Sequence, residues 1–481
     1  MSVPVKIAIV GAGFSGTLVA AHLLRQTKSP LTVYLIERTP RQFGRGVAYS
    51  SGMDCHLLNV PAANMSAFPD DPEHFLRWAQ RREGGRAQRR EGGPTKEQEE
   101  SLINPPWVTE VAPTSFLPRR AYGDYLSWVI DEAERAASPT VRLERKVDKA
   151  VGVSITPEGA NLRLLSGETL QVQKVVLALG NFLPGNPTVA DPRFYESPRY
   201  HGNPWSSEVL QDLLATHSCL LIGAGLTMAD WAITLSEAGY RGTIHVVSRR
   251  GLWPLAHQPY TPVPFSIDPN APPQTVRAWL HQIRQYIRSS GCDWRAVIDA
   301  LRPTNQTLWK SLPISERRRF LRHLRPFWDF HRHRIAPSIA ARLQVLVDSG
   351  QLVRHVGRIM GYRETGRDVD VLIRQRGQGR VDSVRVDAVV NCSGSESDYR
   401  ELQSPLIKDL LDQGLIHPDP LSLGLDVGQD GALIGADGAA SDCLFSLGPP
   451  QKGILWETTA VPEIRGQAAR LATVLLDGLD A

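Results

Sequence analysis

The sequence predicts an α/β protein with two doubly wound units, the second of which carries a helical insertion. Two observations predict the units: a short apolar run that ends in a glycine turn and leads into a segment with helical spacing occurs near the N-terminus and again near the middle of the chain. A third observation predicts the insertion, because residues 274–347 combine helical periodicity with many Arg, His and Trp residues.

Length and composition fit this architecture and exclude several others. The chain has 481 residues, of which 42% are hydrophobic and 22% charged, as in ordinary soluble proteins of two to three domains. A net charge of +4 gives no reason to expect a nucleic-acid or membrane partner. The N-terminus lacks the features of a secretory signal, and no run approaches the about 18 apolar residues of a spanning helix. We therefore expect a cytoplasmic protein.

The five cysteines are odd in number and form no C-x-x-C pair. This pattern argues against a disulfide framework, a zinc ribbon and a dithiol redox centre. We accordingly expect no metal site.

The first glycine turn follows the apolar run 5–10. Its sequence, GAGFSG, fits G-x-G-x-x-G: Gly11 permits the tight turn, Gly13 lets the backbone approach a pyrophosphate, and Gly16 lets the helix pack closely on the strand. Glu37 ends the next apolar run, where a carboxylate can accept hydrogen bonds from both hydroxyls of an adenosine ribose. The predicted cofactor contacts of this Rossmann-like domain are Gly11, Gly13, Phe14, Ser15, Gly16 and Glu37.

The second glycine turn differs from the first in charge. Met228 replaces the third glycine, which loosens the predicted packing of helix on strand. Counted from the first glycine of each turn, the position that holds Glu37 in the first unit holds Arg249 in the second. A carboxylate repels a ribose 2′-phosphate, whereas a guanidinium binds it through charge-assisted hydrogen bonds. The predicted contacts are Gly223, Gly225, Leu226, Thr227, Ser248, Arg249 and Arg250.

This contrast predicts FAD in the first domain and NADPH in the second. An alternative stays open, in which Arg249 and Arg250 are solvated arginines on a surface turn. The predicted FAD domain comprises residues 1–205 and 385–481, and the NADPH domain residues 206–384 with its insertion at about 274–347. The polar segment 81–105 is predicted to be a flexible surface insertion.

A strongly basic segment occupies residues 315–337. Arg318, Arg322 and Arg325 fall on one face at helical spacing. Side chains further along this segment are candidates for orienting an anionic substrate such as the carboxylate of an amino acid, although a solvated basic helix is an equal alternative. These candidates are His331, Arg332, His333 and Arg334.

Longer stretches at residues 46–50, 56–78, 115–126, 327–337 and 446–471 resemble a known family. They are similar to bacterial FAD/NAD(P)-binding proteins, which are flavoproteins with two dinucleotide-binding domains. More distantly, the chain resembles flavin-dependent N-hydroxylating monooxygenases.

The resemblance implies further contacts. Asn59 and Met65 would lie in a loop that borders the flavin, and the segment that contains Gly448, Trp456 and Thr458 would cover the flavin ring. His201 stands four residues before Trp205, as at the end of a flavin monooxygenase fingerprint, although Ser197 replaces the glycine of that fingerprint. His201 is therefore a weak catalytic candidate, and a hydrogen-bonded structural histidine is the alternative.

The activity that the resemblance implies is an FAD- and NADPH-dependent monooxygenase. It would use molecular oxygen and a C4a-hydroperoxyflavin to hydroxylate the nitrogen of a small amine or amino acid, with a carboxylate-bearing amine as the expected substrate. Two alternatives stay open: an NADPH-dependent flavoprotein reductase or dehydrogenase without oxygen insertion, and a non-enzymatic nucleotide-binding protein.

Overall fold

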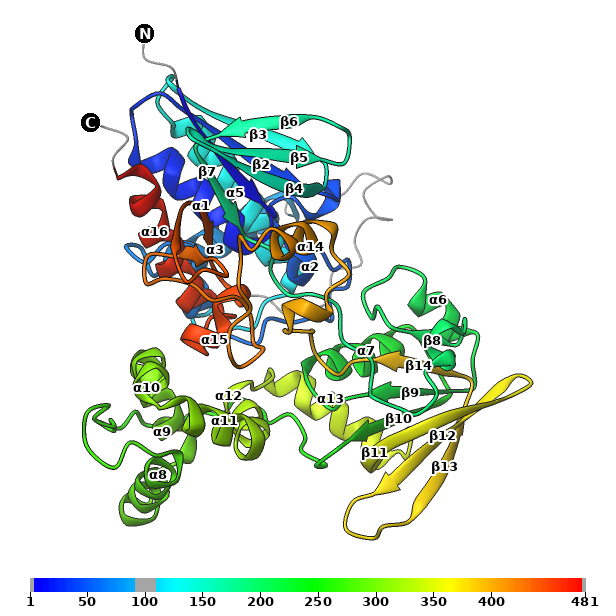
Figure 1. Ribbon diagram of the computed structural model, residues 1–481. Helices are drawn as coiled ribbons and strands as arrows, with labels where there is room; N and C mark the ends of the chain where they lie inside the picture. Colours follow the sequence, from blue (N-terminus) through cyan, green and yellow to red (C-terminus); the bar gives the residue numbers. More distant parts are fainter. Residues whose placement is uncertain (1–3, 91–109, 478–481) are drawn as a thin grey trace. The chain divides into compact units, whose positions relative to one another are not determined.

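The computed structural model describes residues 4–90 and 110–477 of the chain (Figure 1). The chain folds into two compact units, Met1–Asn181 with Ser397–Ala481, and Phe182–Glu396. The sequence-based boundaries lay at residues 205 and 385 instead. The difference arises because β8 (Tyr200–His201) and β14 (Ala388–Asn391) both pair in the sheet of the second unit.

The first unit is built on a six-stranded sheet with the order β15-β16-β7-β1-β2-β3. The central strand β1 pairs in parallel with β2 and β7, and only β15 runs antiparallel to its neighbour. A second, antiparallel sheet contains β4, β5 and β6. The strands are β1 (Val5–Val10), β2 (Leu31–Glu37), β3 (Val141–Val147), β4 (Ala150–Thr156), β5 (Gly159–Leu164), β6 (Thr169–Val172), β7 (Lys174–Leu177), β15 (Ala432–Ile434) and β16 (Ala440–Ser446).

Helix α1 (Phe14–Gln26) is almost entirely buried in this unit, since it packs against β1, α5 and α16. Its apolar side chains join those of the strands and of α16 in one hydrophobic core. The helices and 3₁₀ turns are α1, η1 (Pro40–Gln42), α2 (Gly46–Tyr49), η2 (Ala62–Asn64), α3 (His74–Arg90), α5 (Arg119–Ala136), η5 (Tyr399–Glu401), α14 (Pro405–Asp412), η6 (Pro449–Gln451), α15 (Lys452–Leu455) and α16 (Val461–Leu476).

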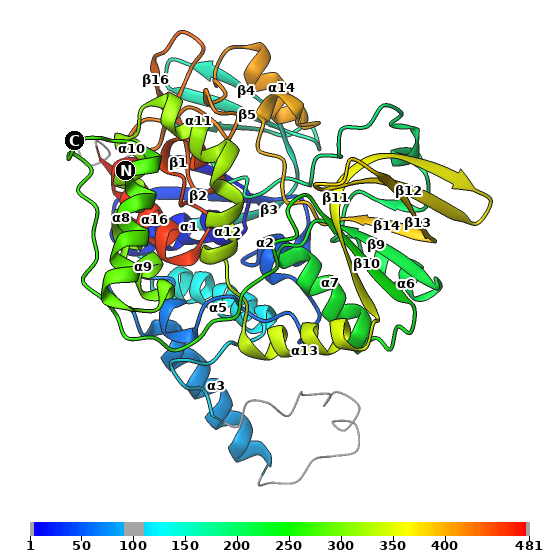
Figure 2. The same cartoon turned by 90° about the horizontal axis from the view of Figure 1, so that it is seen from below.

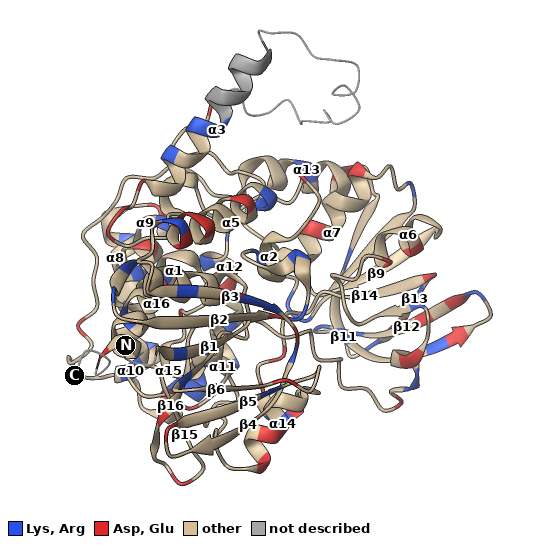
Figure 3. Cartoon of the chain, turned by 90° about the horizontal axis from the view of Figure 1, so that it is seen from above, with Lys and Arg blue, Asp and Glu red and all other residues tan. Residues whose placement is uncertain are grey.

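The second unit has a seven-stranded sheet with the order β13-β12-β11-β10-β9-β14-β8. Strands β11, β10, β9, β14 and β8 are parallel, whereas β12 and β13 form an antiparallel extension. Both signs of charge are interspersed along that extension (Figure 3), and Arg385 pairs there with Asp370. The remaining strands are β9 (Ser218–Ile222), β10 (Thr243–Ser248), β11 (Leu352–Thr365), β12 (Asp368–Gln375) and β13 (Val381–Val386).

The predicted helical insertion lies between β10 and β11 as a run of short helices, while α7 and α13 lie side by side near the sheet (Figure 2). Its basic segment is not one continuous helix, because α11 ends at His323 and α12 begins at Arg325, before Pro326. The expected single face of Arg318, Arg322 and Arg325 is therefore broken. The helices and turns are η3 (Arg193–Glu196), α6 (Val209–Leu214), α7 (Leu226–Glu237), α8 (Val276–Ser290), α9 (Trp294–Ala300), η4 (Arg302–Thr304), α10 (Asn305–Ser311), α11 (Ile314–His323), α12 (Arg325–Arg332) and α13 (Pro337–Asp348).

The polar segment 81–105 begins inside a helix, since α3 extends to Arg90. Residues 91–105 of that segment lie outside the described residues. Within residues 4–90 and 110–477, none of the helices has the length and apolar character that crossing a bilayer requires.

We predict that Gly16→Ala destabilises the first unit, although alanine is the better helix former. A Cβ atom on Gly16 would lie 1.9 Å from the carbonyl oxygen of Gly11, which is backbone and cannot rotate away. We expect a loss of about 3 kcal/mol in the free energy of unfolding, measured by urea denaturation. Gly52→Ala is the control, because a Cβ atom there meets no atom within 4 Å. Equal stability of both variants would contradict the prediction.

We also predict that His22 makes the first unit acid-sensitive. Burial, reinforced by the nearby Arg25, lowers the pKa of His22 from 6.5 to about 4. Between these pH values the imidazole of His22 is protonated in the unfolded chain but not in the folded chain. The free energy of unfolding therefore falls as the pH drops from 6.5 towards 4, by up to about 3 kcal/mol.

The measurement is urea unfolding at a series of pH values between 4 and 6.5. His22→Met should remove the fall in the free energy of unfolding across this range, whereas His417→Met, at an exposed position of the same unit, should not. An unchanged slope in the His22 variant would refute the assignment.

Candidate dinucleotide-binding sites

The first glycine turn is held between two strands. Gly11 has φ +101°, and its N–H donates to the carbonyl oxygen of Ile36 at 2.9 Å. A Cβ atom on Gly11 would lie 2.4 Å from the carbonyl oxygen of Ala178, directly after β7. Only glycine meets both demands, so the turn is locked at the carboxyl ends of β1, β2 and β7.

The N-terminus of α1 is free of side-chain caps. Gly13 is the N-cap residue, and no side chain accepts a hydrogen bond there. A Cβ atom on Gly13 would stand 3.3 Å from the Cα atom of Gly46, the first residue of α2. Two glycines from separate segments therefore leave bare backbone at a helix end whose N–H groups and dipole favour phosphate.

Glu37 lies beside this turn. Its Oε2 atom accepts a hydrogen bond from the backbone N–H of Ala12 at 3.1 Å, and the side chain is only 7% exposed. Among the described residues, no donor reaches its Oε1 atom. The second oxygen can therefore accept from ribose hydroxyls, as the sequence predicts.

The second glycine turn repeats the same backbone geometry. Gly223 has φ +100°, and its N–H donates to the carbonyl oxygen of Val247 at 2.8 Å. A Cβ atom on Gly223 would lie only 2.7 Å from the carbonyl oxygen of Cys392, which is too close. Gly225 is the N-cap residue of α7, and no side chain accepts a hydrogen bond at this helix end. A Cβ atom on Gly225 would meet nothing within 4 Å. Met228, at the position of the missing third glycine, is fully buried.

The hydrogen bonds of the two turns correct the sequence-based alignment by one residue. Gly11 donates to Ile36, which precedes Glu37, whereas Gly223 donates to Val247, which precedes Ser248. Ser248, not Arg249, therefore occupies the place of Glu37. The connection in the second unit is one residue shorter, a difference that counting along the chain does not reveal.

The two arginines after β10 have different surroundings. Arg249 is exposed, and no hydrogen bond or ion pair joins it to the described residues. Arg250 donates from Nη2 to the carbonyl oxygen of Arg322 at 3.2 Å, and its guanidinium lies 5.4 Å from the ring centroid of Phe327. Arg250 is thus engaged with the helical insertion, and Arg249 is available to a ligand.

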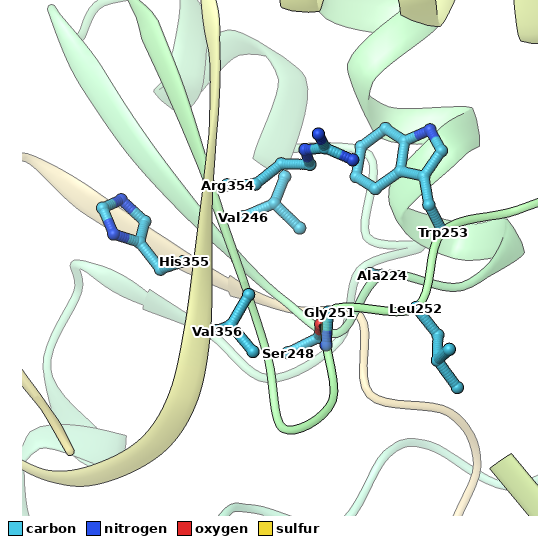
Figure 4. Close-up of a pocket in the computed structure, with 9 residues that line it drawn as sticks. All are labelled: Ala224, Val246, Ser248, Gly251, Leu252, Trp253, Arg354, His355 and Val356. Atoms are coloured by element: carbon cyan, nitrogen blue, oxygen red, sulfur yellow. Dashed lines mark hydrogen bonds between the residues drawn. The ribbon is translucent and has the colours of Figure 1, made fainter. Parts of the chain in front are cut away.

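A pocket of about 280 Å³ adjoins this strand end (Figure 4). It runs from the glycine turn across the end of β10 and the first residues of β11. Its lining residues are Ala224, Val246, Ser248, Gly251, Leu252, Trp253, Arg354, His355 and Val356. The sequence singled out only Ser248 of this set.

The C-terminal segment expected to cover the flavin has a distorted backbone at Trp456. This residue has φ +58° and ψ −66°, a conformation that is costly for a bulky side chain, and it is 7% exposed. Thr458 is fully buried and donates to the carbonyl oxygen of Gly448 at 2.9 Å. Strain of this kind is retained where the surroundings dictate the backbone, which marks the segment as a candidate ligand contact.

The remaining predicted site residues, Asn59, Met65 and His201, differ in their burial and in their neighbours. Met65 is 2% exposed and belongs to the hydrophobic core, while Asn59, in the same loop, is partly exposed. His201 stands 3.9 Å from Asp212 (Nδ1 to Oδ2), and burial lowers its pKa. The structure gives His201 the features of a neutral, partly buried histidine on β8.

The candidates of the basic segment have different neighbours, although Arg332 and Arg334 both lie close enough to Asp299 to lower its pKa. The ring of His331 contacts Trp294 edge-on, and its Nδ1 atom lies 2.7 Å from the carbonyl oxygen of Phe327. His333 lies 3.8 Å from Asp329 (Nε2 to Oδ1). Arg332 is 8% exposed.

Arg334 is the most deeply buried of these side chains, at 3% exposure. Its Nη2 atom donates to both carboxylate oxygens of Asp299, at 2.5 and 2.6 Å, and Tyr260 also donates to Asp299. Burial alone would raise the pKa of Asp299, but the hydrogen bonds from Arg334 and Tyr260 outweigh it and lower the pKa. The Nε and Nη1 atoms of Arg334 have no acceptor among the described residues.

Comparison with known proteins agrees with this geometry. Residues 8–182 match the model of a family described as FAD-NAD(P)-binding. This part of the chain is therefore an FAD/NAD(P)-binding domain, as predicted. Among curated proteins, none matches the sequence.

Solved structures with the same fold cover the whole chain. Ornithine hydroxylase from Pseudomonas aeruginosa is 14% identical, with a TM-score of 0.62, and the match covers 99% of this chain and 100% of that one. Ornithine N-hydroxylase of Kutzneria sp. 744, described with reduced FAD, NADP⁺ and L-ornithine, is 13% identical at a TM-score of 0.63 and 98% and 99% coverage. The FAD-bound cadaverine monooxygenase from Erwinia amylovora is 14% identical at 0.61, with 98% and 94% coverage.

These similarities confirm the predicted fold class: two Rossmann-like dinucleotide-binding domains, with helices inserted in the second.

We predict that Asp299→Asn destabilises the second unit by about 3–5 kcal/mol, because it leaves the buried charge of Arg334 uncompensated. Urea denaturation measures this loss, and the double variant Asp299→Asn with Arg334→Met should recover part of it. Asp370→Asn is the control and should change stability little, because the arginine that it leaves without this partner, Arg385, is exposed to solvent. Equal effects at the two aspartates would contradict the prediction.

Proposed function

We propose that the protein is an NADPH-dependent FAD monooxygenase that hydroxylates the nitrogen of a small, carboxylate-bearing amine. The observation that carries the proposal is the pair of glycine turns with matching backbone geometry but opposite polarity of the neighbouring side chains, Glu37 in one unit and Ser248 with Arg249 in the other. This pair suits two different dinucleotides. The solved structures with this fold include hydroxylases of ornithine and a cadaverine monooxygenase.

The residues of the first turn fit FAD. Backbone N–H groups at Gly13 and Phe14 would bind the pyrophosphate, and Glu37 would accept hydrogen bonds from the ribose. In the second unit Gly225 and the N-terminus of α7 would bind the pyrophosphate of NADPH, while Arg249 would face its 2′-phosphate.

When bound, the flavin supplies the redox chemistry, since it takes electrons from NADPH and reacts with molecular oxygen. The chain itself supplies binding, orientation and exclusion of water. Trp456 and Thr458, both buried, would hold the C-terminal segment rigidly against the cofactor. No protein nucleophile is required.

A cationic group for a substrate carboxylate is present in the insertion. Arg334 keeps two buried N–H donors, on Nε and Nη1, while Asp299 fixes its orientation through Nη2. A substrate carboxylate would accept a charge-assisted hydrogen bond from one of these donors, since Nε–H and the free Nη1–H point to different sides of the guanidinium. Arg332, His331 and His333 remain weaker candidates for the same task.

A panel of amino acids, diamines and their hydroxyl analogues tests the proposal. Purified protein should contain FAD, oxidise NADPH faster with an amino compound than with its hydroxyl analogue, and yield a product that gains one oxygen atom by mass spectrometry. NADPH oxidation with release of hydrogen peroxide and no oxygenated product across the panel would favour a reductase. FAD binding without NADPH oxidation would favour a non-enzymatic nucleotide-binding protein, and either result would refute the proposal.

A further inference from the structure

The pocket beside the second glycine turn has one cationic wall, which comes from a strand far along the chain. β10 and β11 pair in parallel with Val246 opposite Arg354 and Ser248 opposite Val356. Directly paired residues of parallel strands project from the same face of a sheet, so these four side chains share one face. The helical insertion separates Ser248 from Arg354 in sequence, yet the pairing brings them to the same pocket.

Arg354 is held in place by an aromatic ring. Its guanidinium carbon lies 5.3 Å from the ring centroid of Trp253, within the range of about 6 Å for a cation–π contact. Figure 4 shows Arg354 beside the Trp253 ring, whereas His355 points to the other side of the strand. No hydrogen bond or ion pair joins Arg354 to the described residues, so its donors face the pocket opening or solvent.

The loop after β10 is shaped to close this pocket. Gly251 has φ +68°, and its N–H donates to Oγ of Ser248 at 3.2 Å. A Cβ atom on Gly251 would lie 2.8 Å from a methyl carbon of Val356. The loop therefore approaches β11 at a glycine, and Trp253 is brought over Arg354 as a consequence.

Size and charge point to one portion of a dinucleotide. At about 280 Å³ the pocket lies near the lower end of the range for small-molecule sites, roughly 300 Å³, and it therefore suits one portion of a dinucleotide. No carboxylate lines it. Arg250 is engaged with Arg322 and Phe327, and Arg376 donates to the carbonyl oxygen of Arg250. Among the described residues, Arg249 and Arg354 are therefore the cations near Ser248 whose guanidinium groups make no hydrogen bond.

We propose that Arg354 is a specificity-determining residue that binds the 2′-phosphate of the adenosine ribose, with Trp253 as the positioning residue that holds its guanidinium. The inference rests on the proposed binding of NADPH to the second unit. It assigns to β11 a task that the sequence pattern predicts for the turn after β10, and it replaces Arg250 by Arg354 as the second cation. A planar guanidinium can donate two hydrogen bonds to one phosphate.

The test is a calorimetric titration of the FAD-containing protein with adenosine 2′,5′-bisphosphate and with adenosine 5′-monophosphate. These probes differ only in the 2′-phosphate. Arg354→Ala should weaken binding of the bisphosphate about tenfold to a hundredfold and change binding of the monophosphate less than about twofold. Arg354→Lys should restore part of the loss, because it keeps the charge but not the planar donors.

Two further variants separate charge from structure. Arg358→Ala removes an exposed arginine on β11 that does not line the pocket, and it should leave both affinities unchanged. Trp253→Phe should retain the preference for the bisphosphate, whereas Trp253→Ala should reduce it. With NADPH and NADH as reductants, Arg354→Ala should raise the KM for NADPH alone and leave kcat unchanged.

The outcomes are distinct. If wild-type protein binds the bisphosphate no more tightly than the monophosphate, the proposed NADPH site fails and this inference fails with it. If Arg249→Ala loses the preference for the bisphosphate over the monophosphate while Arg354→Ala keeps it, the NADPH site stands and the assignment of Arg354 is wrong. An equal loss for both probes in Arg354→Ala, with the FAD content unchanged, would also overturn the assignment, because it indicates a structural role.

Discussion

The close approach of each glycine turn to a neighbouring strand is the constraint on which both proposed binding sites depend. Gly11 and Gly223 have nearly the same φ, donate to the carbonyl of the adjacent second strand, and face a carbonyl oxygen that follows a third strand. This contact fixes where α1 and α7 begin and hence where their uncapped N–H groups point. Any added Cβ atom would push the helix end away from the position that phosphate recognition needs.

Charge at the end of the second strand then distinguishes the two units. Glu37 is fixed by the N–H of Ala12, so its free oxygen suits a ribose with unmodified hydroxyls. Ser248 takes its place in the second unit and leaves room for cations that arrive from two directions, Arg249 from the following turn and Arg354 from β11. A small hydroxyl residue at this position removes the repulsion that a carboxylate would exert on a 2′-phosphate.

The arginines of the basic segment, residues 315–337, lie in different environments in the folded chain. Pro326 ends the expected single helix, and the arginines separate into different environments. Arg334 is buried against Asp299, whereas Arg325 pairs with Asp329 at the surface of α12. Burial makes the first pair costly to break, and solvent screening makes the second of little consequence.

The sequence by itself determined the two glycine turns, the acid at Glu37 and the helical insertion, because each is a local pattern with a steric or periodic cause. The tertiary structure alone decided that Ser248 matches Glu37, that Arg250 turns to the insertion, and that β8 and β14 belong to the second sheet. It also decided the pairs Arg334–Asp299 and Arg354–Trp253. Each of these depends on strand register or on contacts between segments distant in sequence, and local periodicity contains no information about either.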